Sequence, residues 1–213
     1  MFRAVLSKNA HDALVLLGKT KILPEKTFLA GGTALALQIG HRRSEDFDFF
    51  TPTSFKSEDL MTKLNKIGNF VLTEKQFKDT LLGLFNGVKF SIFLYPYPLI
   101  DKPIDYLGIK LTSLKDIAAM KLAAIMDRGT KRDFIDLYFL TKNNISLDEM
   151  FVFYDEKFKA LESNLYSLLK SLTYFDDAEK SDMPEMLKKV SWKEVKEFLK
   201  KEVVRVTKKW IGD

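Results

Sequence analysis

Two aspartates, Asp46 and Asp48, stand one residue apart in an apolar stretch of the sequence. Side chains alternate between the faces of a β-strand, so the two carboxylates would share one face and Phe47 and Phe49 the other. Neighbouring carboxylates repel each other, and a divalent cation relieves that repulsion. Mg²⁺ commonly binds one or two carboxylates together with substrate phosphates. The spacing therefore predicts a Mg²⁺ or Mn²⁺ site; the alternative is an edge strand with two hydrated aspartates.

A glycine pair, Gly31 and Gly32, precedes these aspartates, and Thr33 follows the pair. Glycine allows the backbone to approach a phosphate closely. We expect a helix to begin at Thr33 and to end at Gly40, and the amides at a helix N-terminus favour an anion. The order of these parts predicts a metal-bound triphosphate, held between the helix N-terminus and the carboxylates.

One lysine farther along the chain, Lys121, falls on the same helical face as Ile117 and Ile125. A lysine on an apolar face must extend its ammonium to solvent or meet an anion. Asp136 also lies among apolar neighbours, which indicates that it is paired or functional. A salt bridge from Asp136 to Lys121 or to Arg132 is the structural alternative to a functional role.

The string "GGTALALQIGHRRSEDFDFF" (residues 31–50) resembles the nucleotidyltransferase fold of the DNA polymerase beta superfamily, and in particular the AbiEii/AbiGii toxin family. Two later strings are similar to that family in the same order: "KLAAIMDRGTKRDFIDLYFL" (121–140) and "MPEMLKKVSWKEVKEFL" (183–199). The resemblance implies Mg²⁺-dependent transfer of NMP from an NTP to a hydroxyl of RNA, a protein or a small molecule. It also implies the toxin role of an abortive-infection toxin–antitoxin system, with a separate antitoxin. Relatives include enzymes that act on tRNA acceptor ends.

The resemblance extends to individual positions of this sequence. The matching positions are Gly31, Gly32 and Thr33 for the phosphate-side turn, Ser44 for a polar position before the metal ligands, Asp46 and Asp48 for the metal ligands, Lys121 for a phosphate-binding lysine, and Asp133 and Asp136 for acidic positions that orient Lys121 or act as a base.

One position departs from the wider superfamily, in which a third carboxylate usually stands on a neighbouring strand. The corresponding strand here is "VKFSIFLY" (88–95), and its candidate position is Ser91. This departure favours an alternative function, a catalytically silent domain that binds a nucleotide or a partner protein. The retained aspartate pair favours an enzyme.

The composition limits the remaining possibilities. The chain has 213 residues and no cysteine, which excludes disulfides and thiolate metal sites and favours a reducing compartment. The N-terminus lacks the pattern of a signal peptide, and no apolar run approaches the roughly 20 residues that span a bilayer, so we expect a cytoplasmic protein.

Charged and histidine residues give weaker signals. The formal net charge is +5, and many lysines lie in the last third, where a solvated helix face is the simplest interpretation. There are two histidines, which argues against a histidine metal cluster. The segment from His41 to Arg43 fits either a phosphate or RNA contact or a solvated loop.

The periodicity predicts an α+β protein with a nucleotidyltransferase-like α/β core over residues 1–110 and a helical domain over 111–213. Strands are expected at 27–30 and 45–51 and in succession over 70–95, where Asn86-Gly87 predicts a hairpin turn. Irregular structure is expected at 95–103 and a loop at 176–186. Helices are expected at 10–20, 33–40, 57–68 with Ser57 as N-cap, 113–129, 131–143, 147–158, 160–172 and 191–210.

Overall fold

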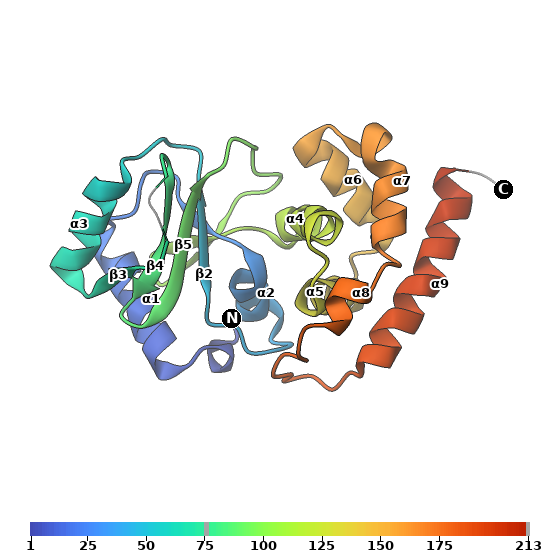
Figure 1. Ribbon diagram of the computed structural model, residues 1–213, viewed down its shortest axis with the longest axis horizontal. Coiled ribbons are helices and arrows are strands. Elements are labelled where there is room, and N and C mark those ends of the chain that lie inside the picture. The colour runs from blue at the N-terminus through green and yellow to red at the C-terminus, as the bar shows by residue number, and fades with distance from the viewer. Residues whose placement is uncertain (75–76, 212–213) are drawn as a thin grey trace. The chain divides into compact units, whose positions relative to one another are not determined.

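The computed structural model describes residues 1–74 and 77–211 and shows the predicted α+β class (Figure 1). The chain forms two compact units, Met1–Ser113 and Leu114–Asp213. The first unit contains the sheet, and the second unit is helical throughout its described elements. The first unit runs a few residues past the boundary that we predicted after residue 110, because the last strand belongs to it.

A seven-stranded sheet forms the centre of the first unit, with the order β3-β4-β5-β2-β1-β7-β6. The strands are β1 (Phe28–Leu29), β2 (Phe47–Thr51), β3 (Phe70–Leu72), β4 (Thr80–Phe85), β5 (Val88–Leu94), β6 (Ile104–Tyr106) and β7 (Ile109–Leu111). β2 is antiparallel to β1 and parallel to β5. A strand with neighbours on both sides has its backbone groups satisfied, so β2 is a firm base for any side chain that it presents.

Helices α1 (Lys8–Thr20), α2 (Gly31–Ile39) and α3 (Ser57–Ile67) and the short 3₁₀ helix η1 (Arg3–Val5) belong to the same unit. α2 follows β1 directly, and most of its residues are buried. α1 passes close to the turn between β6 and β7. A Cβ at Gly18 would lie 2.0 Å from the carbonyl oxygen of Leu107, so this approach requires glycine.

The hairpin predicted at Asn86-Gly87 is confirmed. It joins β4 to β5, and both turn residues have positive φ (49° and 79°), as a type I′ turn requires. A second hairpin, between β6 and β7, was missed. Its strands are three residues long, and its turn, Leu107-Gly108, also has positive φ (56° and 83°) without the usual Asn-Gly sequence. Alternation over three residues is too short to be recognised in a sequence.

The prediction that Ser57 caps α3 is wrong. Ser57 is the first residue of the helix, and the residue before it, Lys56, makes no side-chain cap. The Ser57 hydroxyl lies 3.0 Å from the carbonyl oxygens of both Phe77 and Thr80. It therefore ties the helix to the segment that leads into β4, a tertiary contact that no local pattern indicates.

The second unit contains α4 (Leu114–Asp127), α5 (Lys131–Lys142), α6 (Leu147–Phe158), α7 (Leu161–Ser171), α8 (Asp176–Glu179) and α9 (Trp192–Trp210). The expected loop at 176–186 is wrong for its first four residues, which form α8. Ser191 caps the last helix, since its side chain accepts a hydrogen bond from the Glu194 amide. Within the described chain, no helix is long and apolar enough to cross a membrane.

A buried ion pair joins two helices of this unit. The Lys157 ammonium, in the last turn of α6, lies 2.7 Å from the carboxylate of Asp116, in the first turn of α4. Both side chains are 0% exposed. The two residues are 41 positions apart, and nothing in the local sequence distinguishes Lys157 from a surface lysine.

Candidate active site

The two aspartates lie at the start of β2, which begins at Phe47 and not at Glu45 as predicted. Asp48 is the second residue of the strand and Asp46 immediately precedes it. Both are half-buried, whereas Phe47 and Phe49 are 0% exposed. The phenylalanines therefore anchor the strand in the core and leave the carboxylates near the surface, where a ligand can reach them.

Asp48 is fixed by two neighbouring elements. In the pairing of β2 with β5, Asp48 lies directly opposite Ser91, and the Ser91 hydroxyl donates a hydrogen bond of 2.7 Å to Asp48 Oδ1. The other carboxylate oxygen, Oδ2, lies beside Gly31, where an added Cβ would be 3.0 Å away. Gly31 has φ +65°, which also favours glycine. One oxygen of Asp48 thus accepts from Ser91, and the other borders the N-terminus of α2.

The helix begins at Gly31 and not at Thr33, so both glycines belong to its first turn. The N–H groups of a first turn have no partner within the helix. Thr33 Oγ1 lies 2.6 Å from the carbonyl oxygen of Asp46 and 2.9 Å from Ser44 Oγ, and Thr33 is 1% exposed. A carbonyl can only accept, so the Thr33 hydroxyl donates to Asp46 and the Ser44 hydroxyl donates to Thr33.

This direction of the hydrogen bonds changes the role of both hydroxyls. The proton of Thr33 is used to hold the backbone of Asp46, and the proton of Ser44 is used to hold Thr33. Neither hydroxyl then has a proton left for a phosphate. We therefore assign Thr33 and Ser44 to positioning of the aspartates, and the donors to an anion would be backbone amides.

Arg42 is a site residue that the sequence left undecided. Its side chain packs over the first turn of α2, because a Cβ at Gly32 would lie 2.2 Å from Arg42 Nη2. Arg42 is 3% exposed and His41 is 0% exposed, so a solvated loop is excluded for these two residues. The Arg42 guanidinium also donates to the carbonyl oxygen of Arg43 at 3.0 Å.

In the second unit, Lys121, Asp133 and Asp136 form one buried cluster. Lys121 Nζ lies 2.8 Å from Asp133 Oδ1 and 2.6 Å from Asp136 Oδ2. Asp133 also accepts hydrogen bonds from Arg128 Nε at 3.1 Å and from the Thr130 hydroxyl at 2.6 Å. Arg128 and Thr130 were missed, although Thr130 and Asp133 have the spacing of a capping box.

The protonation of Asp133 follows from these contacts. Burial by itself raises the pKa of Asp133, but the Lys121 ammonium and the Arg128 guanidinium lower it by more, so the pKa lies well below its usual range. A carboxylate of such low basicity is a poor general base at neutral pH. Of the two roles that the resemblance implies, orienting Lys121 fits Asp133 better than acting as a base.

The structure thus places the predicted residues in two groups. Gly31, Gly32, Thr33, Ser44, Asp46 and Asp48 lie together in the first unit, and Lys121, Asp133 and Asp136 lie together in the second. Over residues 1–74 and 77–211, no three His, Cys, Asp or Glu side chains gather in a way that could hold a metal ion.

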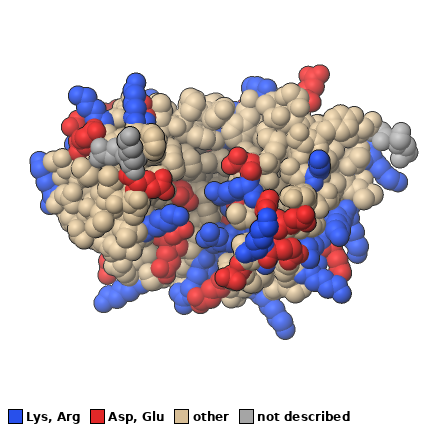
Figure 2. All heavy atoms as spheres, in the orientation of Figure 1, with Lys and Arg blue, Asp and Glu red and all other residues tan. Residues whose placement is uncertain are grey.

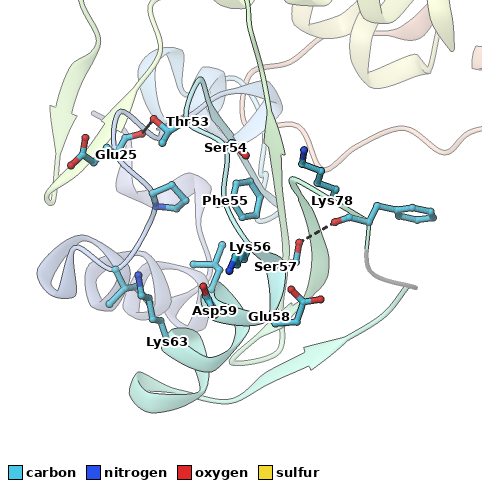
Figure 3. Close-up of a pocket in the computed structure, with 14 residues that line it drawn as sticks. Glu25, Thr53, Ser54, Phe55, Lys56, Ser57, Glu58, Asp59, Lys63 and Lys78 are labelled. Carbon is cyan, nitrogen blue, oxygen red and sulfur yellow. Dashed lines mark hydrogen bonds between the residues drawn. The ribbon is translucent and has the colours of Figure 1, made fainter.

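A cavity of about 770 Å³ lies elsewhere in the first unit, between the segment after β2 and the start of α3 (Figure 3). None of the predicted site residues lines it. The charged side chains that line it are of both signs, with three lysines (Lys56, Lys63 and Lys78) and three acidic residues (Glu25, Glu58 and Asp59). This balance selects no class of ligand, so the aspartate site remains the candidate for chemistry.

Comparison with known proteins places the chain in a family. The profile described as "Nucleotidyl transferase AbiEii toxin, Type IV TA system" matches residues 15–81 and 91–209. An uncharacterized protein of Aquifex aeolicus is 41% identical over 181 residues, which cover 83% of this chain and 85% of that protein.

Solved structures share the fold at low identity. MenT4, a nucleotidyltransferase toxin of Mycobacterium tuberculosis, matches with a TM-score of 0.57 and 16% identity over 94% of this chain and 86% of its own. A putative nucleotidyltransferase of Helicobacter pylori matches with a TM-score of 0.54 and 19% identity over 95% and 96%. The chain belongs to the AbiEii nucleotidyltransferase toxin family of type IV toxin–antitoxin systems. It is therefore an enzyme of the nucleotidyltransferase class, and its family implies a nucleotide substrate and an antitoxin.

Proposed function

We propose that this protein transfers a nucleoside monophosphate from an NTP to a hydroxyl of RNA, a protein or a small molecule. The observation that supports this most directly is the geometry at Asp48. One of its carboxylate oxygens borders Gly31 at the N-terminus of α2. An anion-binding helix end and a cation-binding carboxylate are thus neighbours, which is the arrangement that a metal-bound triphosphate needs.

The donor set fits Mg²⁺ or Mn²⁺. Asp48, in β2, and Asp46, immediately before it, are half-buried carboxylates, and hard divalent cations prefer oxygen ligands. Thr33 and Ser44 fix the backbone of Asp46, and Ser91 fixes Asp48. When bound, the cation would offset the charge that develops as pyrophosphate leaves.

The phosphate side of the proposed site consists of backbone and arginine. The first-turn amides of α2 at Gly31 and Gly32 supply N–H donors, and the helix dipole adds partial positive charge. The Arg42 guanidinium, packed against Gly32, adds positive charge beside the same turn. These groups hold and orient phosphate oxygens without transferring a proton.

The proposed role of Lys121 is to offset triphosphate charge, with Asp133 and Asp136 fixing its ammonium. The two short ion pairs support the fixing, because they hold a flexible side chain in one position. The proposed acceptor is an RNA such as tRNA, a protein or a small molecule. The proposed partner is a separate antitoxin protein, which the toxin–antitoxin family supports.

The test is label transfer. The purified protein is incubated with Mg²⁺ and each α-labelled NTP in turn, together with total RNA or cell extract. Asp46→Asn/Asp48→Asn keeps the shape of both side chains and should abolish transfer. The control Glu58→Gln/Asp59→Asn removes two exposed carboxylates at the start of α3 and should keep it. Metal-dependent NTP binding without any transfer would instead support the catalytically silent alternative.

A further inference from the structure

The positive charge of this protein is concentrated in one segment. Residues 188–209 contain nine lysines and arginines and three glutamates, an excess of six. The whole chain has a formal net charge of +5, so all its other residues together are slightly negative. Most of this segment is α9, which is amphipathic, with Val195, Leu199, Val203 and Val206 buried. Seven of the nine basic residues belong to α9, and those that are exposed lie on its outward side, away from these buried residues. In the view of Figure 2, lysine and arginine side chains lie on the surface together with acidic ones.

The outward side of α9 is not neutralised by neighbouring carboxylates. Ion pairs neutralise its flanks: Lys196 contacts Glu179, and Arg205 and Lys209 contact Asp148. The other exposed lysines of α9 form what we call the α9 lysine face, which consists of Lys193, Lys200, Lys201 and Lys208.

Pairing on the α9 lysine face is weak. Lys193 has a loose contact of 3.8 Å with Glu197, and both side chains are largely exposed. Among residues 1–74 and 77–211, no carboxylate lies within 4 Å of the ammonium of Lys200, Lys201 or Lys208. Like charges on one helical face repel each other, and a bound polyanion would remove that cost.

From this arrangement we infer that the α9 lysine face binds the phosphates of an RNA strand. At 1.5 Å per residue, Lys193 and Lys208 are separated by about 22 Å along the helix, which is long enough to follow several phosphates. The inference rests on the proposed function in one respect, because it selects RNA among the acceptors left open there.

Phosphate is a better fit to this face than an acidic protein. Protein–protein interfaces are poor in lysine and bury aromatic or aliphatic side chains at their centre. On the α9 lysine face, the large apolar side chain that is exposed among the lysines is Val204, at 60%. Phosphate contacts, in contrast, are made by lysine and arginine and need no apolar centre.

The experiment measures RNA affinity as a function of salt. The probe is a fluorescein-labelled oligouridylate, used in EDTA without nucleotide so that no transfer occurs. Lys200→Gln/Lys201→Gln/Lys208→Gln removes three ammonium groups from the face. Each phosphate contact in a single strand contributes about 0.7 to the slope of log affinity against log salt, so the slope should fall by about 2.

The matched control is Lys56→Gln/Lys63→Gln/Lys66→Gln, which changes the net charge equally at exposed positions on or beside α3. The control should keep the wild-type slope, and so should Asp46→Asn/Asp48→Asn. The inference would be overturned if the salt slope fell equally in both lysine variants. It would also be overturned if this face bound polyglutamate but not oligouridylate. If the wild type transfers no label but the α9 lysine variant still shows the lower salt slope, that result would count against the proposed function alone.

Discussion

Replacing Ser91 by aspartate should convert the carboxylate pair into a three-carboxylate site whose stability depends on metal. Ser91 is 5% exposed, lies opposite Asp48 and contacts Asp48 Oδ1 at 2.7 Å. A carboxylate at position 91 would lie about 4 Å from that of Asp48. Two charges at this distance repel by about 1 kcal/mol in water and about 4 kcal/mol at an effective dielectric of 20. Since Asp48 is half-buried, we expect Ser91→Asp to cost about 1–4 kcal/mol without metal.

Thermal unfolding in EDTA and in saturating MnCl₂ measures this effect. For a chain of this size, about 2–4 °C of Tm corresponds to 1 kcal/mol, so Ser91→Asp should lower the Tm in EDTA by several degrees. Mn²⁺ should raise the Tm of Ser91→Asp by more than it raises the Tm of the wild type, because ligand binding stabilises the folded state. Ser91→Asn has the same shape without the charge, and it should lack the metal response. Identical behaviour of the Asp and Asn variants would refute the convergence of these side chains on a cation.

Three further changes test other parts of the structure. Lys157→Met should lower the free energy of unfolding in urea by about 3–5 kcal/mol, because it removes the ammonium that pairs with the fully buried Asp116 carboxylate. Lys157→Met/Asp116→Leu should cost much less, and equal losses in the two variants would contradict this account. Because the pKa of Asp133 is lowered in the folded state, its carboxylate stabilises the fold at pH values above its ordinary pKa of about 3.9. The wild type should therefore lose its extra unfolding free energy relative to Asp133→Asn as the pH falls below about 4, and a difference in unfolding free energy that stays constant with pH would contradict this. In Gly31→Ala, the added Cβ would lie 3.0 Å from Asp48 Oδ2 at a residue with φ +65°. This variant should lower the free energy of unfolding by about 1–2 kcal/mol and should bind Mn²⁺ more weakly, as calorimetry would show.

Local patterns predicted those parts of the site that depend on neighbours in the sequence. The alternation of Asp46, Phe47, Asp48 and Phe49 predicted which of these residues are buried, because that periodicity is a property of an extended chain. The same pattern could not show that the Ser44 hydroxyl donates to Thr33 and the Thr33 hydroxyl to the Asp46 carbonyl, because this depends on how the segment before β2 passes α2. The resemblance implies that Thr33 belongs to the phosphate-side turn, and the hydrogen bonds favour a positioning role for Thr33 and Ser44.

The sequence alone determined the α+β class, the turn at Asn86-Gly87 and the positions of most helices, since periodicity, caps and positive φ act within a few residues. Only the tertiary structure decided which side chains meet across the chain. Ser91 contacts Asp48 over 43 positions and Lys157 contacts Asp116 over 41. Arg42 is buried against α2 although its neighbours in the sequence are polar or charged. Burial and pairing of this kind depend on the packing of distant elements, and for that reason a single sequence does not display them.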